Sequence, residues 1–251
     1  MNKNKNGIMV LSSILLISPL SAIAEDWSYE IEPYMMASSI TGDAAVGRVT
    51  GVAVEVGFDD ILDNLDMAGM LHFEAHHKSG WGISLDYGFM DLGADISTSN
   101  GAIVDIGVHQ GVFEALAINR HQVSGGTLDY SFGIRWWDND LDLLIDPALL
   151  PGSLDASVKA DWVDFVVGAR YSHKLNNHWN FVIQGDIGAG GADFTSSFAI
   201  GANYKMNDKW TLDLRYKSTW VDYKDGSVGT PEYFAYDTNT KGPIVGFSYK
   251  F

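Results

Sequence analysis

The stretch WGISLDYGF, residues 81–89, alternates strictly between apolar and polar side chains. Its odd-numbered residues, from Trp81 to Phe89, are all apolar, whereas its even-numbered residues are glycine, serine and aspartate. Successive side chains of a β-strand point to opposite faces, so this period of two predicts a strand with one apolar face. The same alternation returns in WTLDLRYKSTW at 210–220 and in LDYSFGIRW at 128–136. The chain is therefore predicted to be all-β.

Alternating runs of this kind recur along most of the chain and are separated by polar turns. Short and long connections alternate, apart from the short GAGGAD segment at 188–193. An even number of strands with both ends and the tight turns on one side is typical of an antiparallel up-and-down transmembrane β-barrel. We predict such a barrel with ten strands, and eight strands are the alternative. The predicted strands span residues 27–39, 66–77, 80–92, 107–121, 126–138, 159–173, 178–190, 194–205, 209–223 and 240–251.

The start of the chain has the pattern of a secretory signal peptide. Lysines are followed by an apolar run from Ile8 to Leu20 and by AIA at 22–24, which fits a small-x-small cleavage site. An uncleaved anchor is the alternative, but the run is shorter than the ~20 residues that a spanning helix needs. We predict a signal peptide at 1–24 and an outer-membrane barrel domain at 25–251. The later sequence has no apolar run of helix-spanning length, so a membrane-embedded chain must close into a barrel.

Composition excludes some functions. The chain has 16 basic and 32 acidic residues, and its formal net charge is −16 at pH 7. Nucleic acid is therefore not an expected partner, because its binding requires a basic surface. The sequence contains no cysteine, so stability must come from elsewhere than disulfides. GAGGAD is not a phosphate-binding loop, because no helical pattern follows it, and we expect no cofactor.

Aromatic residues mark two levels along the predicted strands. One level lies beside the tight turns, and a second follows at Phe89, eight residues after Trp81, and at Trp220, ten residues after Trp210. Ten residues of about 3.3 Å, tilted by about 45°, climb roughly 23 Å, close to the ~25 Å apolar band of membrane barrels. A soluble β-sandwich, the alternative, has no reason to hold aromatic residues at this separation. The predicted aromatic girdle comprises Trp81, Phe89, Tyr171, Trp179, Tyr204, Trp210 and Trp220.

The second face of the strands carries mixed charge and is predicted to line the lumen. We expect these charges to pair into a network, because a barrel of eight strands is already filled by side chains and ten strands add little room. His72, Glu74 and His76 share this face and raise a metal site as an alternative. Alternate strand residues are about 7 Å apart, so the two histidines cannot share one ion without bending. The predicted lumenal network comprises Glu74, Asp86, Asp129, Arg135, Arg170, Asp213 and Arg215.

The longer connections are acidic. DNDLDLL, residues 138–144, has the aspartate spacing that begins an EF-hand loop, but Leu143 and Leu149 stand where glycine and a bidentate glutamate are needed. An EF-hand is excluded, and a looser attraction for divalent cations stays open. FDDILDNL, residues 58–65, has helical spacing and predicts a short helix at the barrel mouth. The acidic residues expected on this side are Asp43, Asp59, Asp60, Asp63, Asp138, Asp140, Asp142, Asp146 and Asp155.

Two other functions remain alternatives. A small or gated pore that prefers cations would use the mixed lumenal charge. A hydrolase would need an Asp–His pair at the outer rim of the lumen, and only His109, four residues after Asp105, is expected there. Among 7 histidines and many aspartates, one such pairing is expected by chance. We therefore predict no enzymatic activity.

The chain ends in VGFSYKF, which places Val245, Phe247, Tyr249 and Phe251 on the lipid face of the last strand. With the signal peptide, the alternating strands and the aromatic levels, this ending resembles the small outer-membrane β-barrel proteins of Gram-negative bacteria, of the opacity-type or OmpA-like group. The resemblance covers residues 25–251. It implies assembly by the outer-membrane insertion machinery, which in this family recognises the C-terminal strand and its final aromatic residue. It implies no activity, because similar barrels serve as anchors, adhesins, pores and enzymes.

The sequence thus predicts an exported integral outer-membrane protein with a structural or surface-interaction role. Its expected partners are the outer-membrane bilayer with lipopolysaccharide, the insertion machinery during assembly, and divalent cations at the acidic loops.

Overall fold

The computed structural model describes residues 26–97, 103–146 and 154–251. These residues form twelve β-strands and one short α-helix, and all strand pairs are antiparallel. No helix in the described part of the chain is long and apolar enough to cross a membrane. The elements are β1 (Trp27–Met36), β2 (Ser39–Val46), β3 (Val49–Val56), α1 (Phe58–Asp63), β4 (Leu65–His77), β5 (Trp81–Ser97), β6 (Ile103–Val123), β7 (Gly126–Asp146), β8 (Leu154–Lys174), β9 (Trp179–Gly190), β10 (Phe194–Lys205), β11 (Trp210–Asp225) and β12 (Phe234–Lys250).

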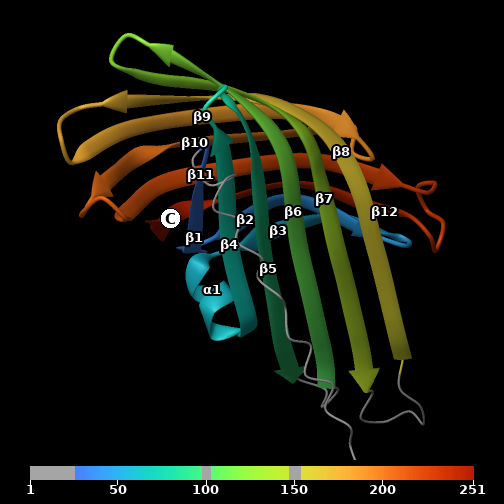
Figure 1. Ribbon diagram of the computed structural model, residues 1–251. Helices are drawn as coiled ribbons and strands as arrows, with labels where there is room; N and C mark the ends of the chain where they lie inside the picture. Colours follow the sequence, from blue (N-terminus) through green and yellow to red (C-terminus); the bar gives the residue numbers. More distant parts are fainter. Residues whose placement is uncertain (1–25, 98–102, 147–153) are drawn as a thin grey trace, which may run out of the picture.

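Ten of the strands in the described residues close into a barrel. The strand order runs from β1 through β4 to β12, and β12 pairs again with β1. Ile31 of β1 accordingly faces Phe73 of β4 on one side and Tyr249 of β12 on the other. The predicted all-β antiparallel barrel of ten strands is confirmed, and the alternative of eight strands is wrong. Figure 1 shows the tilted strands curving around a common interior.

The two ends of the barrel differ. The end that carries the tight turns after β4, β6, β8 and β10 is called the turn end, and the opposite end is called the loop end. The tight turns lie where the sequence predicted them, but β6, β7 and β8 have 21 residues each and run past their predicted limits. Figure 1 shows β5 to β8 projecting beyond the other strands at the loop end. The apolar alternation used for the prediction extends only over the part of each strand that would face lipid. Backbone pairing continues beyond this part, for example between Leu141 and Val158.

The first long connection, residues 40–65, contains a β-hairpin that the sequence analysis missed. In this hairpin β2 pairs with the loop-end half of β12, and β3 pairs with β2. Its signals were the alternating valines of VAVEV, residues 52–56, and Gly47, whose φ of 60° suits the two-residue turn. The short helix predicted at 58–65 is confirmed as α1.

Strands β1 and β2 lie end to end along β12, with a break at Ala37 and Ser38. Gly242 of β12 lies opposite this break, where a Cβ atom would stand 2.0 Å from the carbonyl oxygen of Ala37. Glycine is therefore required for the close approach of the two backbones. The carbonyl oxygen of Pro243 accepts a hydrogen bond of 2.9 Å from the Ala37 amide. The chain thus changes from the closed barrel wall to the β2–β3 hairpin without losing its pairing with β12.

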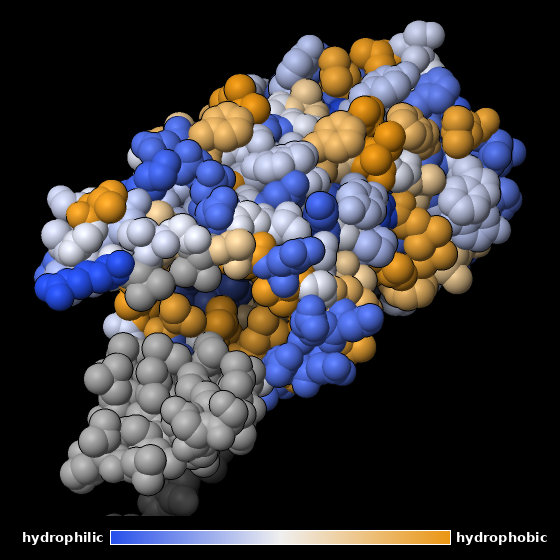
Figure 2. Space-filling view, turned by 180° about the vertical axis from the view of Figure 1, so that it is seen from behind, coloured by the Kyte–Doolittle hydropathy of each residue, from blue (hydrophilic) through white to orange (hydrophobic). Residues whose placement is uncertain are grey.

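The outer wall of the barrel is apolar and carries the aromatic residues predicted as a girdle. Figure 2 shows apolar side chains spread over this wall. Near the turn end, Trp179 packs on Tyr204 with ring centroids 4.9 Å apart, and Trp210 packs on Tyr249 at 4.8 Å. Trp81 and Trp220 are exposed on the same wall. The remaining two, Tyr171 and Phe89, contact the rings of His173 and Tyr87, respectively.

Candidate functional site

Arg170 reaches across the lumen from β8 and holds two carboxylates. Its guanidinium donates to both oxygens of Glu74 on β4, with Nη2 2.9 Å from Oε2. It also donates to Asp129 on the adjacent β7, with Nη2 2.8 Å and Nε 3.1 Å from Oδ2. Arg120 of β6 completes the cluster with two hydrogen bonds of 2.7 Å to Asp129. This cluster ties β4 to the opposite wall of the barrel.

Arg135 of β7 makes a second cross-lumen cluster. Its Nε donates to Glu114 of β6 at 2.7 Å, Nη2 to Asp186 of β9 at 2.9 Å and Nη1 to the hydroxyl of Thr195 on β10 at 3.0 Å. The side chain of Arg135 is only 1% exposed. All three nitrogens of this guanidinium are therefore used in a buried position, where each bond is stronger than at the surface.

Arg215 of β11 forms the third cluster, with Glu32 of β1 at 3.0 Å and with Asp213 of its own strand. Between β1 and β11 runs β12, and a Cβ atom at Gly246 of β12 would lie 2.3 Å from Oε1 of Glu32. Gly246 thus leaves room for the glutamate to pass over the closing strand. This lumenal glycine belongs to the C-terminal VGFSYKF segment, whose aromatic residues face the other way.

His72 joins the clusters through two carboxylates. Its Nδ1 lies 3.0 Å from Asp86 and its Nε2 lies 3.1 Å from Glu74, which also accepts from His76 Nε2 at 2.7 Å. The hydroxyl of Tyr34 donates to Asp86 at 2.8 Å. In the described ranges, no group of three or more His, Cys, Asp and Glu side chains is arranged to hold a metal ion. His72 and His76 belong to the network through their contacts with Glu74 and Asp86.

Every residue of the predicted lumenal network lies in one of these contacts. Tyr34, Arg120 and Thr195 also take part, although the sequence did not lead us to assign them to the lumen. The level of the barrel that contains the clusters of Arg135, Arg170 and Arg215 is called the waist. The clusters leave a cavity of about 60 Å³ there, which has room for a few water molecules. A polar cavity of about 260 Å³ lies between the waist and the turn end. The charged side chains thus narrow the lumen at this level to a small polar cavity.

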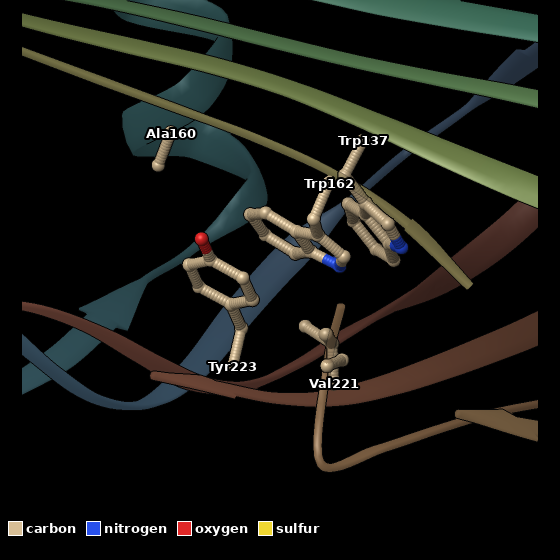
Figure 3. Close-up of a cluster of buried hydrophobic side chains, with 6 residues drawn as sticks. Trp137, Ala160, Trp162, Val221 and Tyr223 are labelled. Atoms are coloured by element: carbon tan, nitrogen blue, oxygen red, sulfur yellow. The ribbon is translucent and has the colours of Figure 1, made fainter. Parts of the chain in front are cut away.

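Above the waist, toward the loop end, aromatic rings from β7, β8 and β11 pack together inside the lumen. Trp162 stacks on Tyr223 with centroids 3.8 Å apart and on Trp137 at 5.6 Å (Figure 3). The indole N–H of Trp162 donates to Asp164 at 3.1 Å. This cluster was not predicted from the sequence, although Trp137 and Trp162 each stand two residues from the inward-facing Arg135 and Asp164. The alternation therefore contained the signal, which was overlooked because aromatic residues were assigned to the lipid face.

His109, the candidate for an Asp–His pair, points away from the lumen. Its Nδ1 contacts a carboxylate oxygen of Asp91 on β5, and its ring stacks on Phe89 with centroids 6.5 Å apart. The next residue, Gln110, lines the lumen instead. The side chain of Asp105, the partner suggested by sequence, lies outside the described residues. The described geometry therefore puts His109 on the outer wall, away from the lumenal rim.

The EF-hand-like aspartates lie in β7 and not in a loop, because this strand continues to Asp146. Lys159 of β8 bonds Asp140 at 3.1 Å and lies 3.5 Å from Asp138. Of the other acidic residues expected in loops, Asp43 belongs to β2, whereas Asp59, Asp60 and Asp63 belong to α1. The side chains of Asp146 and Asp155 lie outside the described residues.

The C-terminal residues close the barrel at the turn end. Val245, Phe247 and Phe251 are exposed on the outer wall. The Phe251 amide donates to the Tyr29 carbonyl at 3.1 Å, and the two rings stack with centroids 5.6 Å apart. Phe251 therefore continues the pairing of β12 with β1 to the last residue.

No family model matches the sequence, and no curated protein is detectably similar to it. The translocator domain of the autotransporter NalP from Neisseria meningitidis is similar in structure, with a TM-score of 0.51 and 14% identity over 90% of this chain and 88% of that one. The outer membrane protease OmpT from Escherichia coli gives a TM-score of 0.50 and 9% identity over 90% and 97% of the two chains. At these identities the similarity shows the fold alone. The chain has the fold of the outer-membrane β-barrel proteins.

Arg135→Ala is expected to destabilise the barrel strongly, because it leaves Glu114 and Asp186 as buried charges without their partner. Removing one member of a buried ion pair costs about 3–5 kcal/mol of the free energy of unfolding. The midpoint of urea unfolding in detergent should therefore move to a clearly lower urea concentration. Lys159→Ala is the control, since its exposed ion pairs contribute only about 0–1 kcal/mol. Equal midpoints for the two variants would show that the Arg135 cluster does not stabilise the barrel.

Proposed function

We propose that the protein is an integral outer-membrane β-barrel of a Gram-negative bacterium with a structural or surface-interaction role and no catalytic activity. The observation that carries this proposal is the network of Arg135, Arg170 and Arg215 with their carboxylates, which occupies the waist of the lumen. A barrel filled in this way acts through its outer wall and its ends. The pore and the hydrolase are the competing functions.

The loop end supports a role at the cell surface. The backbones of the long strands β6, β7 and β8 stay paired beyond the level of the outer aromatic residues. Charged side chains such as Asp140 and Lys159 lie on the outer face of these strands. A rigid sheet that projects from the membrane offers a surface for lipopolysaccharide, for divalent cations or for another cell. In the finer version of this proposal, the protein is an opacity-type barrel exported by a signal peptide cleaved after Ala24.

In planar bilayers, we expect the folded protein to give no discrete conductance steps, because salt-bridged side chains fill its waist. An open porin reconstituted in the same bilayers is the positive control. Discrete conductance that changes in an Arg135→Lys variant would instead establish the pore. Turnover of a peptide or a phospholipid that is lost in His109→Ala would contradict the absence of catalysis.

The proposed orientation can be tested by cysteine labelling, because the native chain contains no cysteine. Ser227 is exposed in the loop between β11 and β12, and Asn177 is exposed in the tight turn between β8 and β9. In intact cells, a bulky maleimide that cannot cross the outer membrane should label Ser227→Cys and not Asn177→Cys. Both variants should react after the outer membrane is permeabilised. The reverse pattern would overturn the assignment of the loop end to the cell surface.

Deletion of Phe251 is expected to reduce assembly in cells, if the insertion machinery reads the final aromatic residue. Assembly can be measured as the fraction of the protein whose gel migration changes on boiling. Phe251→Tyr keeps the aromatic ring and serves as the control, so it should assemble normally. Refolding of the purified deletion variant into detergent separates recognition in cells from loss of barrel stability. Unchanged assembly of the deletion variant in cells would refute this role of Phe251.

A further inference from the structure

The lumen contains an apolar cavity of about 260 Å³ at the loop end. It lies between the β2–β3 hairpin and the loop-end halves of β5 to β8, and aliphatic side chains make most of its lining. Ligand pockets typically measure about 300–1,000 Å³, so this cavity suits a small or narrow ligand. The charge network at the waist separates it from the polar cavity at the turn end. Its lining includes Val54, Val56, Leu92, Val108, Leu141 and Val158.

The barrel wall has a break beside this cavity, where β3 and the loop-end part of β5 are not paired with each other in the described residues. In the described residues, β3 pairs with no strand other than β2, and β5 beyond Leu92 pairs with no strand other than β6. One backbone hydrogen bond ties β5 to the end of α1 there, since the Gly93 amide donates to the Asn64 carbonyl at 2.9 Å. The cavity is lined by both sides of this break, with Val54 and Val56 on β3 and Leu92 on β5. Leu92 stands three residues beyond Phe89 of the outer aromatic level. The break therefore begins where the outer surface of a membrane would lie.

Helix α1 lies in this break and is apolar on two sides. Ile61 is buried and packs with Ile40 of β2 and Met90 of β5 beside the cavity. Phe58 and Leu62 of the same helix are 42% and 55% exposed. The helix therefore presents apolar residues both to the buried side of the break and to the outside.

The cavity also contains a polar group that lacks a partner. Gln110 Nε2 donates to Asn139 Oδ1 at 3.3 Å and to the Tyr236 hydroxyl at 2.8 Å. Asn139 lines the cavity, and its buried Nδ2 has no hydrogen-bond acceptor among the described residues. A buried donor without a partner is costly, so an acceptor oxygen on a ligand would be favoured there.

From the break, the apolar lining and the free Asn139 donor, we infer that the cavity binds a single aliphatic chain that carries a carboxyl or ester oxygen. The chain enters sideways past α1 from the outer face of the membrane, and its oxygen accepts a hydrogen bond from Asn139. A free fatty acid and an acyl chain of a membrane lipid share this chemistry. The inference does not depend on the proposed surface role, since a closed barrel of any function could hold such a ligand.

Equilibrium dialysis of radiolabelled decanoic acid against the protein in nanodiscs tests the cavity, with empty nanodiscs as the background. We expect saturable binding that Val158→Trp abolishes, because the indole fills the cavity. Val167→Trp introduces the same side chain on the exposed outer wall of the same strand, and it should bind like the native protein. Heat-modifiable gel migration of each variant checks that it is folded. Equal binding by a folded Val158→Trp variant would rule out the free acid as the occupant of the cavity.

The hydrogen bond to the ligand oxygen is tested with Asn139→Leu. This variant should bind decanoic acid about three- to tenfold more weakly, while retention of decane, which has no oxygen, should be unchanged. An equal effect on both ligands would remove Asn139 from the site.

A second arm separates the two sources of the chain. Protein in nanodiscs that contain a radiolabelled phospholipid is exchanged into unlabelled nanodiscs, and the label that stays with the protein is measured. Label kept by the native protein and by Val167→Trp, but lost from Val158→Trp, would identify a lipid chain. Saturable binding in the dialysis arm alone would identify a free acid. Absence of cavity-dependent binding in both arms would overturn the inference.

Discussion

Closure of the sheet between β1 and β12 is the contact on which the rest of the structure depends. An open strand edge in lipid would leave N–H and C=O groups without partners, at a cost of several kcal/mol for each group. β12 removes the edges because it pairs with β11 along its length, with β1 near the turn end and with β2 near the loop end. The alternation of its last residues serves this closure, since Phe247 meets the lipid side while Gly246 leaves space for Glu32 inside.

A narrow closed barrel also dictates what its interior must contain. At the waist the inward residues are largely charged, and their buried polar groups must satisfy one another. Arginine suits this task, since its planar guanidinium has five N–H donors that reach carboxylates on different strands. Arg135 connects β6, β9 and β10 in this way, and Arg170 connects β4 with β7. The waist is consequently held by side chains as well as by the hydrogen-bonded wall.

The alternation of the sequence was sufficient to predict the ten strands of the barrel and the inward face of the charged network residues, since both follow from a period of two. It could not predict partners across the lumen. Whether Arg135 meets Asp186 or Asp213 depends on the register and stagger of the closed barrel, which no local pattern encodes. The pairing of His109 with Asp91 likewise results from the β5–β6 register. The β2–β3 hairpin was missed for a different reason, because the search for apolar alternation ended with the lipid-facing part of the wall.

The need to pair every backbone N–H and C=O group in lipid also explains where the barrel wall can break. In the described residues, the edge of β3 that has no partner strand begins at Val56, which pairs with Ile40 of β2. Ile40 lies across β12 from Thr219, the neighbour of Trp220, and the edge extends from this level away from the turn end. Beyond the outer aromatic level, water can satisfy an open strand edge, so the cost that forbids a break in the hydrocarbon region no longer applies. The loop-end half of the barrel is therefore free to adopt a hairpin, a short helix and an apolar cavity. The turn-end half of the barrel must stay a continuous hydrogen-bonded cylinder, and the polar side chains inside it must pair with one another.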